Sequence, residues 1–212
     1  MPDKHDDPGH ITWGWKDELL GARVWYYAKL LRKKSQIMVA FGSCACEGCI
    51  PGLGNFSTVD QLIDTAFTTL STDNPQNLRP RTSYDMPEGT LTIPTMNPLL
   101  KTLDQVVDVD YYMPGCPPES HQIAAVVELV IAALQGKAQL PPKGATIGAG
   151  NSTVCDECTR KRNVKMIKEF GRIQLTHPDP ELCLLEQGIP CNGVATRSGC
   201  NARCPSAGAQ CI

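Results

Sequence analysis

The sequence lacks several features that would assign it to a common class of protein. No apolar run is long enough to cross a bilayer, because the longest one, Ile123 to Leu134, is short and contains Glu128. The net charge of −2 gives no electrostatic footprint for nucleic acid or an anionic membrane. Internal repeats and low-complexity tracts are absent. With 42% hydrophobic and 20% charged residues, the composition fits a soluble globular protein of one or two domains.

A catalytic constellation is also missing from the sequence. The histidines are scattered, and we interpret them as solvated or structural residues: His5, His10, His121 and His177. We therefore expect no catalytic residue in this chain.

What the sequence does have is cysteine, eleven in all. The last sixty or so residues contain Cys155, Cys158, Cys183, Cys191, Cys200, Cys204 and Cys211. Few apolar runs accompany them, so this segment needs a crosslink to fold. The candidates are disulfides, zinc and iron–sulfur clusters.

Disulfides are the least favoured candidate. They need an oxidising compartment, the N-terminal residues contain no apolar h-region, and the cysteine total is odd. Zinc suits the Cys155-x-x-Cys158 pair followed by two further cysteines. Iron–sulfur clusters use the same soft thiolates, usually four per cluster. Spacing alone leaves zinc and iron open.

Two cysteines outside this segment follow expected strands of a parallel sheet. The apolar run 37–41 leads into Gly42-Ser-Cys44, and the run 106–112 leads into Gly115-Cys116-Pro. Ligands of open α/β sheets bind beyond the carboxyl ends of the strands. We therefore expect Cys44 and Cys116 to lie at one edge of the sheet and to share a ligand.

The remaining elements are expected to alternate with these strands. Apolar periodicity predicts helices over 16–34, over 57–70 with Thr58 or Ser57 as cap, and over 123–134. A helical turn is expected at 99–103. Residues 71–98 show no period and are interpreted as a long surface excursion.

These motifs in this order resemble the small subunit of [NiFe] hydrogenases. The likeness rests on strand–Gly42-Ser-Cys44-Ala, on Pro114-Gly-Cys116-Pro-Pro-Glu119 before a helix, and on the cysteine tail. The related iron–sulfur subunit of respiratory NADH dehydrogenase resembles the core but has no such tail. Over residues 29–212 the chain most resembles the cytoplasmic methyl-viologen-reducing, heterodisulfide-reductase-linked group.

The resemblance implies a flavodoxin-like α/β domain with a parallel sheet over 29–140 and an irregular cysteine-rich iron–sulfur domain over 141–212. Residues 1–28 form a leader of unclear status. Up to three [4Fe–4S] clusters are implied. Their ligands match Cys44 and Cys116 for the proximal cluster, Cys155, Cys158, Cys183 and Cys191 for the distal cluster, and Cys200, Cys211 and a further candidate, Cys204, for the medial cluster.

Two departures from the family pattern concern the ends of the chain. The family begins with a strand ending in Cys-x-x-Cys, but this chain has no cysteine before Cys44. Whether Cys46 or Cys49 substitutes as a ligand stays open. The family's last Cys-x-Gly-Cys motif is incomplete at Cys211. We therefore expect the sequence to be truncated at both ends.

The implied function is electron transfer in the cytoplasm between a partner large subunit, which holds the nickel–iron active site, and a downstream acceptor subunit. Two alternatives remain: an iron–sulfur subunit like that of NADH dehydrogenase, and a zinc-stapled binding module without redox activity. Colour separates iron–sulfur protein, which is brown, from zinc protein, which is colourless.

Overall fold

The computed structural model describes residues 15–16, 20–92, 95–96, 98–163 and 167–212. It divides into two compact units, Met1–Tyr112 and Met113–Ile212, and each is described by itself. The leader expected at 1–28 lies largely outside the described residues, and the domain boundaries remain a prediction. No described helix is long and apolar enough to span a membrane.

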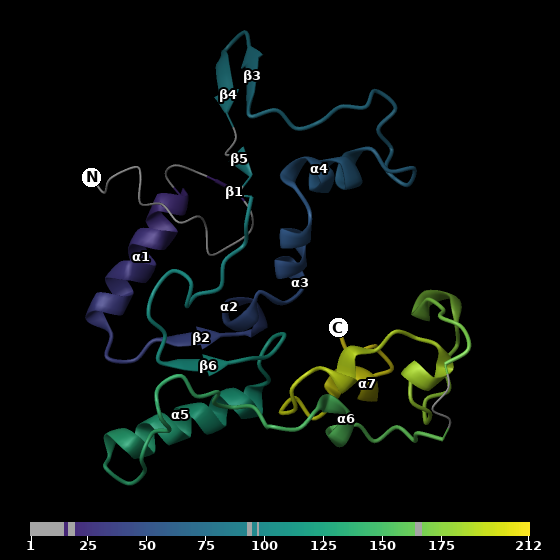
Figure 1. Cartoon of the computed structure of the whole chain (residues 1–212). Coiled ribbons are helices and arrows are strands. Elements are labelled where there is room, and N and C mark those ends of the chain that lie inside the picture. The colour runs from purple at the N-terminus through teal and green to yellow at the C-terminus, as the bar shows by residue number, and fades with distance from the viewer. Residues whose placement is uncertain (1–14, 17–19, 93–94, 97, 164–166) are drawn as a thin grey trace. The chain divides into compact units, whose positions relative to one another are not determined.

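The first unit is mixed α/β and contains three two-stranded sheets, β1–β5, β2–β6 and β3–β4 (Figure 1). Its elements are β1 (Trp15–Lys16), α1 (Leu20–Lys34), β2 (Val39–Phe41), α2 (Ser43–Glu47), α3 (Cys49–Gly52), the 3-10 turn η1 (Leu53–Phe56), α4 (Val59–Phe67), β3 (Ser83–Met86), β4 (Gly89–Thr92), β5 (Thr95–Met96) and β6 (Tyr111–Met113).

The small parallel sheet pairs β2 with β6, and β2 leads into the short helix α2 (Figure 1). Cys44 lies on α2. The Met38 carbonyl accepts hydrogen bonds from the amides of Asp110 (2.8 Å) and Tyr111 (3.2 Å). The Asp110 carboxylate accepts from the Met38 amide at 2.8 Å and pairs with Arg32, the cation near the end of α1. This buried acid therefore fixes α1 and the start of β2 to the segment before β6.

The strand expected over 106–112 is shorter than predicted. The amides of Val106 and Val107 both donate to the Leu103 carbonyl at 3.0 Å, which makes a turn where an extended chain was expected. The helical turn expected at 99–103 does not form either. In the described residues the expected sheet has two strands.

The excursion 71–98 contains a β-hairpin that the sequence did not predict. β3 and β4 pair antiparallel, with Met86 opposite Gly89 around a two-residue loop. All eight of their residues are exposed, so no apolar alternation marks them. The capping prediction for α4 is confirmed, because Thr58 Oγ1 accepts from the Gln61 amide at 3.2 Å.

The second unit packs one long helix against the cysteine tail. Its elements are α5 (Ser120–Leu134), α6 (Val154–Glu157), η2 (Ile173–Leu175), η3 (Leu185–Gln187), η4 (Asn192–Val194) and α7 (Arg203–Ser206). Buried Gln122 donates to the Gly148 carbonyl at 2.6 Å, and His121 Nε2 lies 2.8 Å from the Gly199 carbonyl. His121 thus has a structural contact, in line with the structural or solvated role expected from the sequence.

Candidate metal centre

The first pair of tail cysteines lies at the two ends of one short helical turn. The Asp156 carboxylate accepts from the Thr153 amide (2.8 Å) and hydroxyl (2.9 Å), which closes the N-terminus of α6. Val154 is fully buried and anchors the turn. Cys155 lies in α6 and Cys158 follows its last residue, and both line the same cavity.

The second pair is held by a separate loop with its own buried anchors. Leu184 and Ile189 lie between the two cysteines and are almost completely buried. The Cys183 amide donates to the Lys161 carbonyl at 2.8 Å, which attaches this loop to the segment that follows Cys158. The structure thereby brings separate stretches of the tail into one site.

All four cysteines border one cavity. Its wall consists of Cys155, Cys158, Cys183 and Cys191 together with Val154, Arg160, Leu184, Gly193 and Pro205. The thiols are half-buried. A half-buried group of soft thiols among apolar side chains has the donor chemistry of an iron–sulfur or zinc site.

Gly193 leaves room beside two of the sulfurs. A Cβ atom added at this position would lie 3.5 Å from Cys155 Sγ and 3.8 Å from Cys191 Sγ. A Cβ atom here would make ordinary van der Waals contact with both sulfurs, so the glycine leaves the space of a side chain open beside them. Such an open space suits a bulky group bound between the sulfurs.

A second group of cysteines adjoins the first. Cys211 is buried with Val154 and Ala202, and Cys158, Cys191 and Cys200 pack against them. The Cys211 amide donates to Cys191 Sγ at 3.4 Å, and Cys211 Sγ donates to Thr196 Oγ1 at 3.3 Å. Cys204 is exposed on α7. Cys191 thus belongs to both neighbourhoods.

Burial favours the protonated form of two of these thiols. It is the largest cause of the raised pKa of Cys155, which Arg162 opposes and neighbouring thiols reinforce. It also raises the pKa of Cys211, against a lowering effect of Thr196. Binding of a metal group therefore releases protons here, because the ligand is the thiolate.

Glu157, within the Cys-Asp-Glu-Cys motif, links the two groups of cysteines. Its carboxylate accepts from the amides of Gly199 (2.7 Å) and Ala202 (3.3 Å), which flank Cys200. Sequence reasoning missed this role, and it assigned no role to Arg160 or Gly193. In the sequence, Glu157 ends a short polar motif and Arg160 belongs to a basic run, and both patterns are typical of surface residues.

The sheet-edge cysteines fall in different units. Cys44 is exposed on α2 and Cys116 is exposed before α5, so their predicted convergence stays a prediction. Burial and nearby Cys49 raise the pKa of Cys44. Cys46 Sγ donates to the carbonyl of Ala40, a residue of the preceding strand β2, at 3.2 Å.

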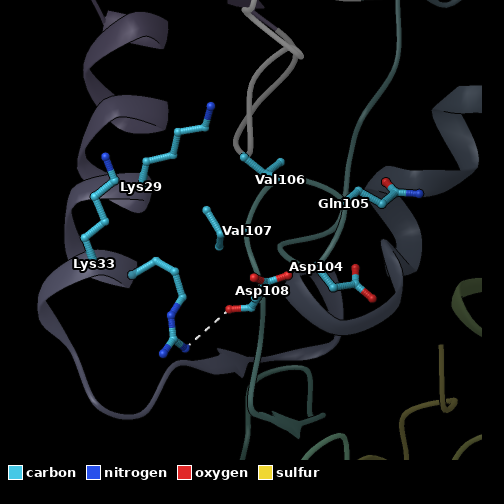
Figure 2. A pocket seen from close by; sticks show the side chains of 8 residues that line it. Lys29, Lys33, Asp104, Gln105, Val106, Val107 and Asp108 are labelled. Atoms are coloured by element: carbon cyan, nitrogen blue, oxygen red, sulfur yellow. Dashed lines mark hydrogen bonds between the residues drawn. The ribbon is translucent and has the colours of Figure 1, made fainter.

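A larger hollow in the first unit is lined by charge rather than by sulfur. It measures about 330 Å³ and lies between α1 and the segment before β6. Figure 2 shows Lys29 and Lys33 on the helix side and Asp104 and Asp108 on the other. Arg32 donates to the Asp108 carbonyl at 3.4 Å across this space.

Within the described residues, no group of three or more His, Cys, Asp or Glu is arranged to hold a single metal ion.

Residues 22–130 match the family described as the 20 Kd subunit of NADH ubiquinone oxidoreductase. The match includes slightly more than half of the chain, and the chain belongs to this family. Cys44 and Cys116 lie inside the matched range. The tail from Cys155 to Cys211 lies outside it.

Curated relatives extend the similarity into the tail. An iron-sulfur subunit of the F420-non-reducing hydrogenase of Archaeoglobus profundus is 39% identical over 217 aligned positions, which cover 100% of this chain and 64% of that protein. A subunit of the F420-non-reducing hydrogenase of Methanocaldococcus jannaschii is 40% identical over 182 aligned positions, which cover 85% of this chain and 56% of that protein. The chain thus spans less than two thirds of either relative.

Among solved structures, a chain of the NAD+-reducing [NiFe]-hydrogenase in the H2-reduced state is similar, with a TM-score of 0.41 and 27% identity. The similarity covers 57% of this chain and 62% of that chain.

Proposed function

We propose that this chain is the electron-transferring iron–sulfur small subunit of a [NiFe] hydrogenase, of the cytoplasmic methyl-viologen-reducing type. The observation that carries the proposal is the cavity bordered by four cysteines from separate segments of the tail. It is supported by similarity, along the whole chain, to a protein named as a hydrogenase iron-sulfur subunit.

Each group of cysteines has a role in this proposal. The four cavity thiolates hold one [4Fe–4S] cluster, and Cys200, Cys211 and Cys204 contribute ligands to a second. Cys44 and Cys116 belong to a third, next to the partner's active site. Such a cluster, when bound, accepts and releases single electrons.

The protein supplies the surroundings that set the electron affinity of these sites. Val154 and Leu184 keep water away from the cavity, since both are almost completely buried. The Cys211 amide donates a hydrogen bond to Cys191 Sγ. Hydrogen bonds to sulfur and solvent exposure are two of the main determinants of cluster potential.

The proposed partners are a large subunit that holds the nickel–iron site and a downstream subunit that accepts electrons. Hydrogen activation takes place on the large subunit, so this chain contributes no catalytic residue of its own. The proposed role of this chain is to position the clusters between the two partners.

Specific features distinguish two alternative functions from the proposed one. The family match over 22–130 favours a subunit like that of NADH dehydrogenase, but the cysteine tail lies outside that match. A zinc-stapled binding module would use the same thiols. Colour and metal content distinguish the zinc module from both redox proteins.

The test is anaerobic reconstitution of the full chain, followed by iron and zinc analysis and electron paramagnetic resonance. Cys183→Ser should remove one cluster signal and about four irons per chain. The matched control is Lys161→Gln, because that ammonium is exposed and paired with Glu181, and the substitution should change neither quantity. Stoichiometric zinc without a cluster signal contradicts the proposal.

A further inference from the structure

The cavity of the four cysteines contains one buried cation, Arg160. Only 8% of this residue is exposed, and it lines the cavity together with the thiols. It follows Cys158 by two positions. Arginine keeps its positive charge in proteins, so this wall of the cavity is permanently cationic.

The hydrogen bonds of Arg160 go to the backbone of two other segments. Nε donates to the Pro205 carbonyl at 2.8 Å, and a terminal nitrogen donates to the carbonyls of Asp179 (2.9 Å) and Leu182 (3.0 Å). These acceptors precede Cys183 and follow Cys204. The planar guanidinium therefore holds together three stretches that carry cysteines.

Carbonyl oxygens satisfy the donors of Arg160 but do not cancel its charge. No ion pair between Arg160 and a carboxylate occurs in the described part of the chain. A buried charge without a counterion is costly, whereas a cluster bound by four thiolates is anionic. An anionic cluster held by the thiols of the same cavity would neutralise the charge of Arg160.

We propose that Arg160 is a positioning residue whose buried charge raises the reduction potential of the cluster held by Cys155, Cys158, Cys183 and Cys191. This inference rests on the proposed function. Reduction adds one electron, so the reduced cluster is more negative by one charge. A fixed cation beside it stabilises the reduced form more than the oxidised form, and the midpoint potential rises.

The experiment is a redox titration of the reconstituted full chain, followed by electron paramagnetic resonance. The relevant signal is the one that disappears in Cys183→Ser. Arg160→Gln should shift its midpoint to a more negative potential. Arg160→Lys keeps the charge and should retain most of the wild-type potential although it loses the planar fork. Lys161→Gln is the matched control, because that ammonium is exposed and already paired with Glu181.

Equal potentials in wild type and Arg160→Gln overturn the inference and leave the proposed function intact. A wild-type chain that forms no cluster overturns both. If Arg160→Gln does not load iron, the comparison moves to iron content. Recovery of iron loading in Arg160→Lys then supports the inference that the charge of Arg160 acts on the cluster. Equal loss of loading in both variants overturns that inference and indicates that Arg160 only holds the backbone segments together.

Discussion

Glu157 shows how one side chain couples the two cysteine groups. In Glu157→Ala the amides of Gly199 and Ala202 lose their acceptor. An unsatisfied buried donor costs about 1–3 kcal/mol, so chemical denaturation should show a loss of stability of that order. Glu181→Ala removes an exposed acid paired with Lys161 and should change stability by less than about 1 kcal/mol. Equal effects in the two variants would contradict the linking role.

Gly193 provides a graded test of the space between the thiols. A Cβ at this position meets Cys155 Sγ and Cys191 Sγ at ordinary contact distance, so Gly193→Ala should still load iron. Gly193→Val adds two methyl groups beside the sulfurs and should lower the iron content substantially. The measurement is iron per chain after reconstitution, with circular dichroism as the control for folding. Full loading of the valine variant would show that the bound group lies elsewhere.

The first residue of α3, Cys49, has a backbone conformation that costs free energy. Cys49 has φ of 47°, in the left-handed region that glycine adopts without a Cβ penalty. Cys49→Gly should therefore leave stability unchanged or raise it by up to about 1 kcal/mol, and Cys49→Ala should not raise it. Thermal unfolding measures this difference. A loss of stability in Cys49→Gly larger than in Cys49→Ala would contradict it.

At the scale of elements, periodic segments were predictable and turns were not. The helices α1, α4 and α5 fall within or near the predicted ranges because each has an apolar stripe or a capping residue. Residues 106–110 alternate between apolar and acidic, yet the amides of Val106 and Val107 close a turn on the Leu103 carbonyl, and Asp110 pairs with Arg32, more than seventy positions away. The hairpin β3–β4 was missed because both faces are exposed.

The same limit applies to the candidate site. Soft-thiolate chemistry predicted which residue type matters, and the resemblance selected the group Cys155, Cys158, Cys183 and Cys191, which the structure places around one cavity. Pattern reasoning gave no sign of Arg160 and assigned no role to Gly193. Their roles depend on burial and close approach, which arise only when separate turns of the tail fold together.

Removal of iron should loosen the second unit selectively. Its largest fully buried side chains are Met113, Val154, Leu184 and Ile189, and two of them line the thiol cavity. Because little apolar core remains without the bound group, metal-binding free energy is largely folding free energy in the tail. Hydrogen exchange after chelation should show lost protection over 154–211 and retained protection in β2. Unchanged protection of the tail would mean that it folds without metal.

Assembly with a large subunit is the prediction for the molecule as a whole. The first unit exposes large apolar side chains close together in sequence, Leu53 at 60% and Phe56 at 88%. A contiguous patch of exposed apolar side chains marks an interaction surface, and we expect Leu53 and Phe56 to belong to one. A permanent interface should bury on the order of 2,000 Å² or more, and the isolated chain should be unstable by comparison.

Phe56→Asp tests that surface directly. Phe56 is 88% exposed and therefore makes few contacts in the isolated chain. Its substitution should leave the free energy of unfolding of the isolated chain unchanged. It should weaken co-purification with a co-expressed large subunit on size-exclusion chromatography, because a charge would be buried at the interface. Phe170→Asp, 66% exposed in the second unit, is the matched control and should leave the complex intact. A stable, fully loaded monomer that ignores the large subunit would refute the assembly and, with it, the hydrogenase assignment, because an electron relay needs a catalytic centre at one end and an acceptor at the other.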